Sequence, residues 1–213
     1  MFALWFFCGW VMAGQVGEGR ENVQVIPAIA QYKIGSHLQY IEDPHQTLTL
    51  DDFVGDHRQP MRWNLPEDDV PNFGYTRATY WFHFSLLGVD EGSTSWLLAL
   101  SYSLLDQVTV YFVENERVVR SYETGDIYAF NSRPIEHRHF LFPVPNGGAD
   151  SLDVYFRVQT DGTLELPLTL WEERAFWEQE QNILLLKGVY FGIIFIMVIY
   201  NLFIYFSDRK SVV

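Results

Sequence analysis

The sequence has almost no cysteine and few basic residues. Its single cysteine, Cys8, lies in an apolar run at the N-terminus, so a chain without that run has no thiol. Disulfides, zinc thiolates and a cysteine nucleophile are therefore excluded as the basis of the fold or of an activity. Lysine and arginine number 14 against 27 aspartates and glutamates, which gives a net charge of -13. A nucleic-acid partner needs clustered basic residues, so this balance argues against one, and it also argues against docking on anionic lipid headgroups.

Sequence motifs of common enzymes are also missing. The chain has no glycine-rich phosphate loop, no His-Glu-x-x-His and no Gly-x-Ser-x-Gly. His137 and His139 could supply half of a metal site, but no third ligand has matching spacing. We therefore predict no enzyme activity, no cofactor and no metal. A carbohydrate-active enzyme stays open as an alternative, because its paired carboxylates are defined by their positions in space rather than in sequence.

Two apolar segments differ in length. Residues 2–13 are too few to cross a bilayer but suit a signal peptide, which we place at residues 1–13. Residues 188–206 carry no charge and are long enough to cross a hydrocarbon core, so we predict a transmembrane helix at residues 183–206. Basic residues are balanced on its two sides, and the signal peptide therefore decides the orientation. Residues 14–171 are then exported, residues 172–182 form a polar stalk, and residues 207–213 form a cytoplasmic tail.

The exported segment has the alternating pattern of β-strands. Apolar residues recur at every second position in residues 79–86, 106–113 and 152–159. Turn signals separate such runs, for example Glu114-Asn115-Glu116 and Asp161-Gly162. Short strands with one apolar face each predict an antiparallel β-sandwich. The residues expected in its core are Tyr80, Phe82, Phe84, Val108, Val110, Phe112, Leu152, Val154, Phe156 and Val158.

The chain also resembles a family of bacterial receptors. The resemblance runs from about Ile34 to Phe206 and depends on short motifs in a fixed order. These are Ile34-Gly35, Tyr40-x-Glu42-Asp43, Tyr80-Trp81, Leu104-Leu105-Asp106, Gly125-Asp126, Phe142-Pro143, Phe156-Arg157-Val158, Leu166-Pro167 and Tyr200-Asn201-Leu202-Phe203. In this order they resemble the type 2 extracellular domain of the seven-transmembrane receptors with diverse intracellular signalling modules.

The resemblance implies a fold and a role. The fold is a jelly-roll-like β-sandwich similar to carbohydrate-binding modules, followed by the first transmembrane helix. The domain of such receptors senses a periplasmic ligand, and their cytoplasmic outputs include diguanylate cyclases and histidine kinases. This chain departs from the family pattern because it stops after the first helix, which puts signalling by this chain alone in doubt. A smaller departure is His83, at a position where a basic residue is expected more often.

Two groups of residues are candidates for ligand binding. Outward-facing strand residues combine aromatic rings with hydrogen-bonding groups, a combination that suits a sugar. They are Trp81, His83, Tyr111, Tyr155 and Arg157. The alternative is that several of them pack under loops or belong to opposite sheets. Asp126 and Arg133 form the second group, which could grip a polar ligand or simply hold a loop in place.

The predicted transmembrane helix has features of a helix that packs against others. Gly188 and Gly192 give a small-xxx-small spacing that lets a second backbone approach closely. Asn201 places a side-chain amide within the apolar run. We therefore expect other transmembrane helices as partners, in addition to the lipid bilayer itself.

The most favoured function is a ligand-sensing domain of a bacterial signalling receptor, in the inner membrane with its sandwich in the periplasm. Its partner would be a small molecule, with a sugar as the first choice, and no nucleic acid is expected. A module that docks a periplasmic protein is the main alternative. An exposed apolar patch without a polar-aromatic groove would favour that alternative.

Overall fold

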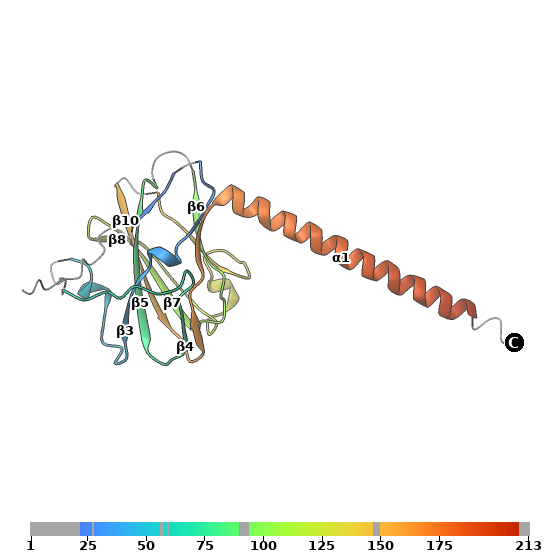
Figure 1. Cartoon of the computed structure of the whole chain (residues 1–213), viewed down its shortest axis with the longest axis horizontal. Coiled ribbons are helices and arrows are strands. Elements are labelled where there is room, and N and C mark those ends of the chain that lie inside the picture. Colours follow the sequence, from blue (N-terminus) through green and yellow to red (C-terminus); the bar gives the residue numbers. More distant parts are fainter. Residues whose placement is uncertain are drawn as a thin grey trace, which may run out of the picture.

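The structure is a computed structural model that describes residues 22–208, apart from residues 27, 56–57, 59, 90–93 and 147–149. The predicted signal peptide, Cys8 and the end of the predicted tail lie outside the described residues. Figure 1 shows a β-sandwich from which one long helix, α1, projects.

The larger sheet, called sheet A here, has six strands. Its order is β1, β5, β10, β7 and β8, and β3 pairs with β5 alongside β1. The strands are β1 (Asn22–Gln24), β3 (Gln39–Asp43), β5 (Thr79–Leu87), β7 (Gln107–Glu114), β8 (Arg117–Thr124) and β10 (Ser151–Gln159). All pairs are antiparallel except β1 with β5, which is parallel.

A second sheet, sheet B, has four antiparallel strands in the order β2, β12, β6 and β9. They are β2 (Gln31–Lys33), β6 (Trp96–Leu100), β9 (Phe140–Pro143) and β12 (Leu168–Glu172). A two-stranded sheet pairs β4 (Asn72–Tyr75) with β11 (Thr163–Glu165). The described part of the domain also has three short 3-10 helices: η1 (Gly35–His37), η2 (Leu50–Asp52) and η3 (Phe130–Ser132).

The core lies between sheets A and B and contains every residue that the alternation predicts. All ten predicted core residues are buried, and they belong to one cluster with residues of sheet B such as Leu98, Phe140 and Phe142. The two sheets meet directly, because the rings of Phe142 in β9 and Phe156 in β10 lie 5.9 Å apart between centroids. The predicted core is therefore confirmed.

Local chemistry explains two of the sharp turns. Asn115 and Glu116 form the two-residue turn between β7 and β8, and both have positive φ values of 49° and 60°. Positive φ at both central residues is the geometry that matches the twist of a tight hairpin. Gly35 opens η1, and a side chain there would collide with the backbone carbonyl of Asp69. Only glycine permits this close approach.

Helix α1 (Glu173–Asp208) follows β12 directly. It is long and apolar enough to cross a membrane, and its apolar part is exposed along its whole length. The prediction of an all-β sandwich followed by one transmembrane helix is confirmed. The first turns of α1, expected to form a polar stalk, pack on the sandwich: Phe176 and Glu180 are only 5% and 9% exposed. The boundary between stalk and span stays a prediction.

Candidate functional site

The outer face of sheet A carries the five predicted strand residues together. His83 of β5 and Tyr111 of β7 both lie opposite Tyr155 of β10, and Trp81 lies opposite Arg157. Residues that are direct partners across neighbouring strands point to the same face of a sheet. The sandwich therefore brings these five side chains to one surface.

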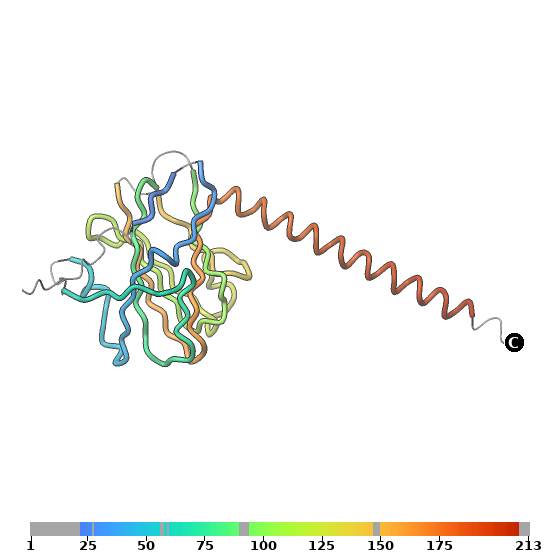
Figure 2. Tube along the Cα trace, viewed as in Figure 1, coloured from blue at the N-terminus to red at the C-terminus, as the bar shows by residue number. Residues whose placement is uncertain are grey.

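A segment between β3 and β5 covers part of this surface. Its Phe53 is 4% exposed and packs on Trp81, with 4.9 Å between ring centroids. η2, which precedes Phe53, is capped by Thr49, whose backbone N–H donates to Asp52 Oδ2 at 2.8 Å. This is one half of a capping box, which stabilises the start of the helical turn. Figure 2 shows this segment, around residue 50 and coloured cyan, on the side of the sandwich away from α1.

A pocket of about 200 Å³ lies between the covering segment and the sheet. His83 and Tyr155 come from the sheet, and their rings lie 4.5 Å apart between centroids. The ring of Trp63 lies 5.5 Å from that of His83. The other described lining residues are Gln39, Phe53, Arg58, Pro60 and Met61. The pocket thus combines ring faces with an amide, an imidazole and a guanidinium.

His83 is held in its position by the carboxylate of Asp153. Its Nε2 lies 3.4 Å from Asp153 Oδ1, and the hydroxyl of Ser85 donates to the same oxygen at 2.5 Å. Burial alone would raise the pKa of Asp153, but the hydrogen bonds from His83 and Ser85 outweigh it and lower that pKa. Asp153 therefore stays ionised and fixes the orientation of the imidazole at the pocket.

Tyr155 is a neutral hydrogen-bonding group under all ordinary conditions. Burial, together with the negative charge of Asp153, raises the pKa of its hydroxyl to about 12, while Arg58 acts in the opposite direction. A neutral phenol can donate and accept a hydrogen bond, as a ligand hydroxyl requires.

The remaining three strand residues do not line the pocket. Trp81 is 1% exposed, and its Nε1 has no hydrogen-bond partner among the described residues. It lies beneath Phe53 and packs within the cluster, as the alternative of packing under a loop anticipated. Tyr111 and Arg157 share the face and lie near each other, but neither is among the described lining residues. The ligand-binding role of all three stays a prediction without support from this pocket.

Asp126 and Arg133 lie in the segment between β8 and β9, and none of the ion pairs among the described residues joins them. Arg133 Nη1 donates to the backbone carbonyl of His137 at 2.6 Å, and its guanidinium lies over the rings of Phe130 and Phe140. Arg133 thus holds its own loop in place, which is the structural alternative considered for this pair.

Sequence reasoning missed the half of the pocket that comes from the covering segment. Phe53, Met61 and Trp63 lie in a stretch rich in proline and acidic residues, which has no strand or helix periodicity. The signal that could have found them is composition. Large apolar side chains in an otherwise polar loop need a surface to cover.

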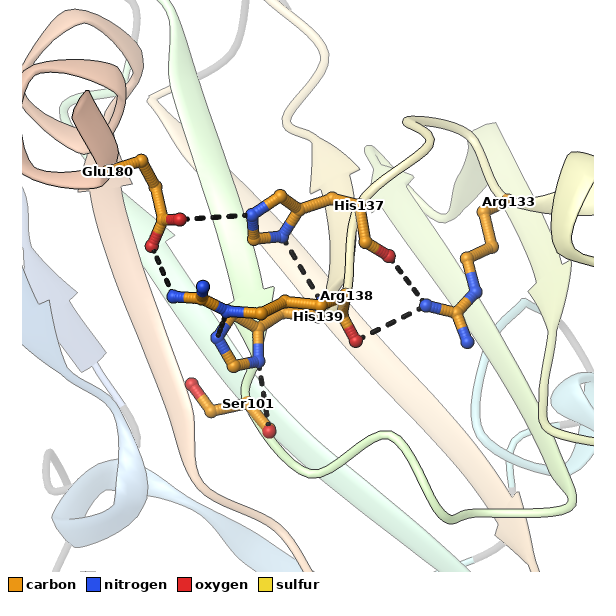
Figure 3. Close-up of polar contacts among 6 residues, drawn as sticks. All are labelled: Ser101, Arg133, His137, Arg138, His139 and Glu180. Carbon is orange, nitrogen blue, oxygen red and sulfur yellow. Dashed lines mark hydrogen bonds and ion pairs between the residues drawn. The ribbon is translucent and has the colours of Figure 1, made fainter. Parts of the chain in front are cut away.

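A second cluster of polar residues joins the sandwich to α1 (Figure 3). Glu180 of α1 accepts from Arg138 Nη2 at 2.8 Å with one oxygen, and its other oxygen lies 3.4 Å from His137 Nε2. Apolar packing surrounds this contact, because Phe176 is buried against Leu141 of β9 and neighbours on sheet B. We call this cluster of Arg138, His137, Glu180 and Phe176 the joint.

The hydrogen bonds at the joint define the tautomers of both histidines. His137 Nδ1 accepts from the backbone N–H of His139, so neutral His137 carries its proton on Nε2 and donates it to Glu180. His139 Nδ1 lies 3.0 Å from the carbonyl of Ser101 and therefore carries the proton, leaving Nε2 to accept from Arg138 Nε at 3.0 Å. The network is fully paired when His139 is neutral.

No group of three or more histidine, cysteine or acidic side chains in the described part of the chain is arranged to hold a metal. His137 and His139, the pair considered as half of such a site, bind Glu180, Ser101 and Arg138 through their ring nitrogens.

Comparison with known families identifies the kind of domain that contains the pocket. A family model described as 7TMR-DISM extracellular 2 matches residues 35–172, about two thirds of the 213-residue chain. The chain belongs to this family. The match ends at the last residue of β12, so the 7TMR-DISM extracellular 2 domain includes the pocket and leads directly into α1.

The 7TMR-DISM extracellular 2 family is a family of extracellular receptor domains and is not a known enzyme family. Together with a C-terminal helix that can cross a membrane, it makes this chain a membrane protein whose sandwich lies outside the cytoplasm. A search of curated proteins finds no match to the chain.

Proposed function

We propose that the chain is the periplasmic ligand-sensing domain of a bacterial signalling receptor, and that the pocket over His83 and Tyr155 binds the ligand. The observation that carries this proposal is the pocket itself. It places aromatic rings beside hydrogen-bonding side chains at the outer face of sheet A. Concave sites with mostly apolar walls and a few well-placed polar groups are typical of small-molecule binding.

The ligand class that suits the pocket best is a sugar. The C–H face of a sugar ring can stack on Trp63 or Phe53, while its hydroxyls need partners such as Gln39, Arg58 and His83. The volume of about 200 Å³ is below the roughly 300–1,000 Å³ of typical ligand pockets. The pocket therefore suits a single ring, either a monosaccharide or one unit of a longer chain.

Binding at the pocket needs a route to the membrane, and strand alternation offers one. Tyr155 lines the pocket, and the next residue, Phe156, points into the core, where it contacts Phe142. The residue before Phe142 is Leu141, which packs against Phe176 of α1. A shift of β10 on binding would reach α1 through this contact between the two sheets. We propose that the joint passes such a shift to the transmembrane helix.

The proposal is tested by thermal unfolding of the whole chain in lipid nanodiscs, with and without a panel of monosaccharides. A compound that binds only the native state raises the melting temperature, and the rise increases with the ratio of its concentration to its Kd. Trp63→Ala and Arg58→Ala should abolish the shift. Tyr75→Ala removes an aromatic side chain that is 73% exposed outside the pocket and serves as the matched control.

Two outcomes would count against the proposal. If a sugar raises the melting temperature of Trp63→Ala and Arg58→Ala as much as that of the unaltered chain, the site lies elsewhere. If no monosaccharide shifts the melting temperature of any variant, the sugar is the wrong ligand class.

A further inference from the structure

Exposed apolar side chains gather close to the joint. Leu104 and Ile127 each have 60% of their surface exposed, and Phe130 has 54%. Leu104 lies between β6 and β7, whereas the other two lie between β8 and β9. The backbone N–H of Asp126 donates to the carbonyl of Leu105 at 2.8 Å, so the two segments are neighbours. We call Leu104, Ile127 and Phe130 the apolar patch.

The two segments that carry the patch are held rigidly together. Gly125 packs so closely on the backbone of Asp106 that any side chain at this position would collide with its carbonyl oxygen. The hydroxyl of Tyr128 donates to Glu123 of β8 at 2.6 Å and ties the same segment to this strand. The exposure of the patch is therefore a property of an ordered surface.

A short chain of contacts links the patch to α1. The guanidinium of Arg133 lies 4.8 Å from the ring centroid of Phe130, and its Nη1 donates to the carbonyl of His137 at 2.6 Å. His137 in turn contacts Glu180 at 3.4 Å. Figure 3 shows Arg133, His137 and Glu180 in this order, with the last on the helix. The patch is thus fixed in position relative to α1.

The position of Glu180 on α1 places the joint near the membrane surface. The uncharged run begins at Gly188, eight residues after Glu180, and a helix rises about 1.5 Å per residue. Glu180 therefore lies about 12 Å from the start of this run, close to the headgroup layer, which is roughly 5–8 Å thick on each side. Figure 1 shows η3, which begins with Phe130, on the side of the sandwich toward which α1 runs.

We propose that the apolar patch inserts into the interface of the outer leaflet of the membrane that α1 crosses. An exposed apolar patch on an ordered surface marks an interaction site, and the bilayer is the apolar partner that α1 already brings to it. With a net charge of -13, the chain gains nothing from anionic headgroups, so the contact depends on apolar side chains. The patch and α1 together would fix the tilt of the sandwich, so that a change at the joint moves the helix.

Nitroxide labels on the whole chain in vesicles of neutral phosphatidylcholine test this proposal, and they do so without any ligand. In a Cys8→Ser background, Leu104→Cys and Ile127→Cys carry the label at the patch. Val118→Cys is the matched control, because Val118 is an apolar residue, 47% exposed, beside the turn between β7 and β8. Figure 1 shows the turn at which β8 begins on the side of the sandwich away from α1. Collision of each label with oxygen and with a water-soluble nickel complex reports whether it lies in lipid or in water.

The patch labels should collide more with oxygen than with the nickel complex, and the label at position 118 should do the reverse. This pattern should persist at high salt, because the contact is apolar. Patch labels that behave like the label at position 118 would overturn the proposal. Patch labels shielded from both reagents would also overturn it, since they would show a protein partner in place of lipid.

Discussion

Phe156 of sheet A and Phe142 of sheet B meet edge to face, with their ring centroids 5.9 Å apart and their planes at 81°. Each has a sequence neighbour on the opposite face of its strand. Tyr155 lines the pocket, and Leu141 packs in the apolar cluster with Phe176 of α1. The contact between Phe156 and Phe142 therefore connects the strand of the proposed ligand site with the strand that packs against the start of the membrane helix.

This contact should contribute to stability beyond the burial of its two rings. Such aromatic pairs contribute about 0.5–1.5 kcal/mol of stability in addition to the contribution of their buried area. In a double-mutant cycle of Phe142→Leu and Phe156→Leu, the loss of unfolding free energy in the double variant should differ by that amount from the sum of the losses in the two single variants. Urea unfolding of the whole chain in nanodiscs measures it. Strict additivity would show that the two sheets are not coupled at this point.

Glu180 should be more important for stability than its neighbour on the same helix. Glu180→Gln weakens charged hydrogen bonds at a buried site and should lower the free energy of unfolding by about 1–3 kcal/mol. Glu178→Gln is the matched control, because Glu178 forms an exposed pair with Arg174, and such pairs contribute little to stability. Equal effects of the two substitutions in urea unfolding would show that the joint does not hold α1.

His139 should make the fold less stable in mild acid. Burial lowers its pKa, and the charge of Arg138 adds to this, although the hydrogen bond to the carbonyl of Ser101 acts in the other direction. The unfolded chain, with a histidine pKa of about 6.5, then binds the proton more readily than the folded one. The stability that the neutral side chain contributes is fully present above this value and is lost as the pH falls below it toward the folded pKa.

The measurement is the free energy of unfolding between about pH 7 and pH 5, a window above the range in which Asp153 titrates. His139→Gln keeps a hydrogen-bonding side chain that does not titrate in this range, so its stability should depend less on pH. His45→Gln, at an exposed position in a loop, is the control and should leave the dependence unchanged. A slope that His139→Gln does not alter would contradict this prediction.

The glycines of α1 should matter more for helix association than Asn201 does. Gly188 and Gly192 are exposed, and a methyl group added at either would meet nothing within 4 Å, so their surface is free for another helix. Asn201 Nδ2 donates to the carbonyl of Met197 in its own helix at 2.8 Å, which reduces its need for a partner. In a transmembrane association assay, Gly188→Ile and Gly192→Ile should weaken association more than Asn201→Leu. The opposite ranking would contradict the small-residue packing.

The sequence predicted the sandwich because alternation decides which side chains are buried, as in Phe82, Val110 and Val154. It also predicted that His83 and Tyr155 face outward, but it left open whether their strands belong to the same sheet, which the pairing of β5 with β10 decides. Alternation could not predict what covers that face, because the covering segment has no period and its path depends on where Phe53 and Trp63 find an apolar surface.

The joint was hidden for a different reason. Glu180 occurs in a polar stretch that is typical of a solvated stalk, and only the tertiary structure brings it to Arg138, 42 residues earlier in the chain. Asp126 and Arg133 illustrate the same limit, since their proximity in sequence suggested a pair that no described ion pair contains.

Methionine methyl signals in an NMR titration test the central claim most directly. The chain has four methionines, so the spectrum of the ¹³C-methyl-labelled protein in nanodiscs is simple, and Met61 lines the pocket while Met197 lies in the transmembrane helix. A sugar that raises the melting temperature should shift the Met61 signal with a saturable dependence on its concentration, and Trp63→Ala should abolish the shift. A sugar that stabilises the protein but leaves the Met61 signal unmoved would show that the pocket over His83 and Tyr155 is not the ligand site.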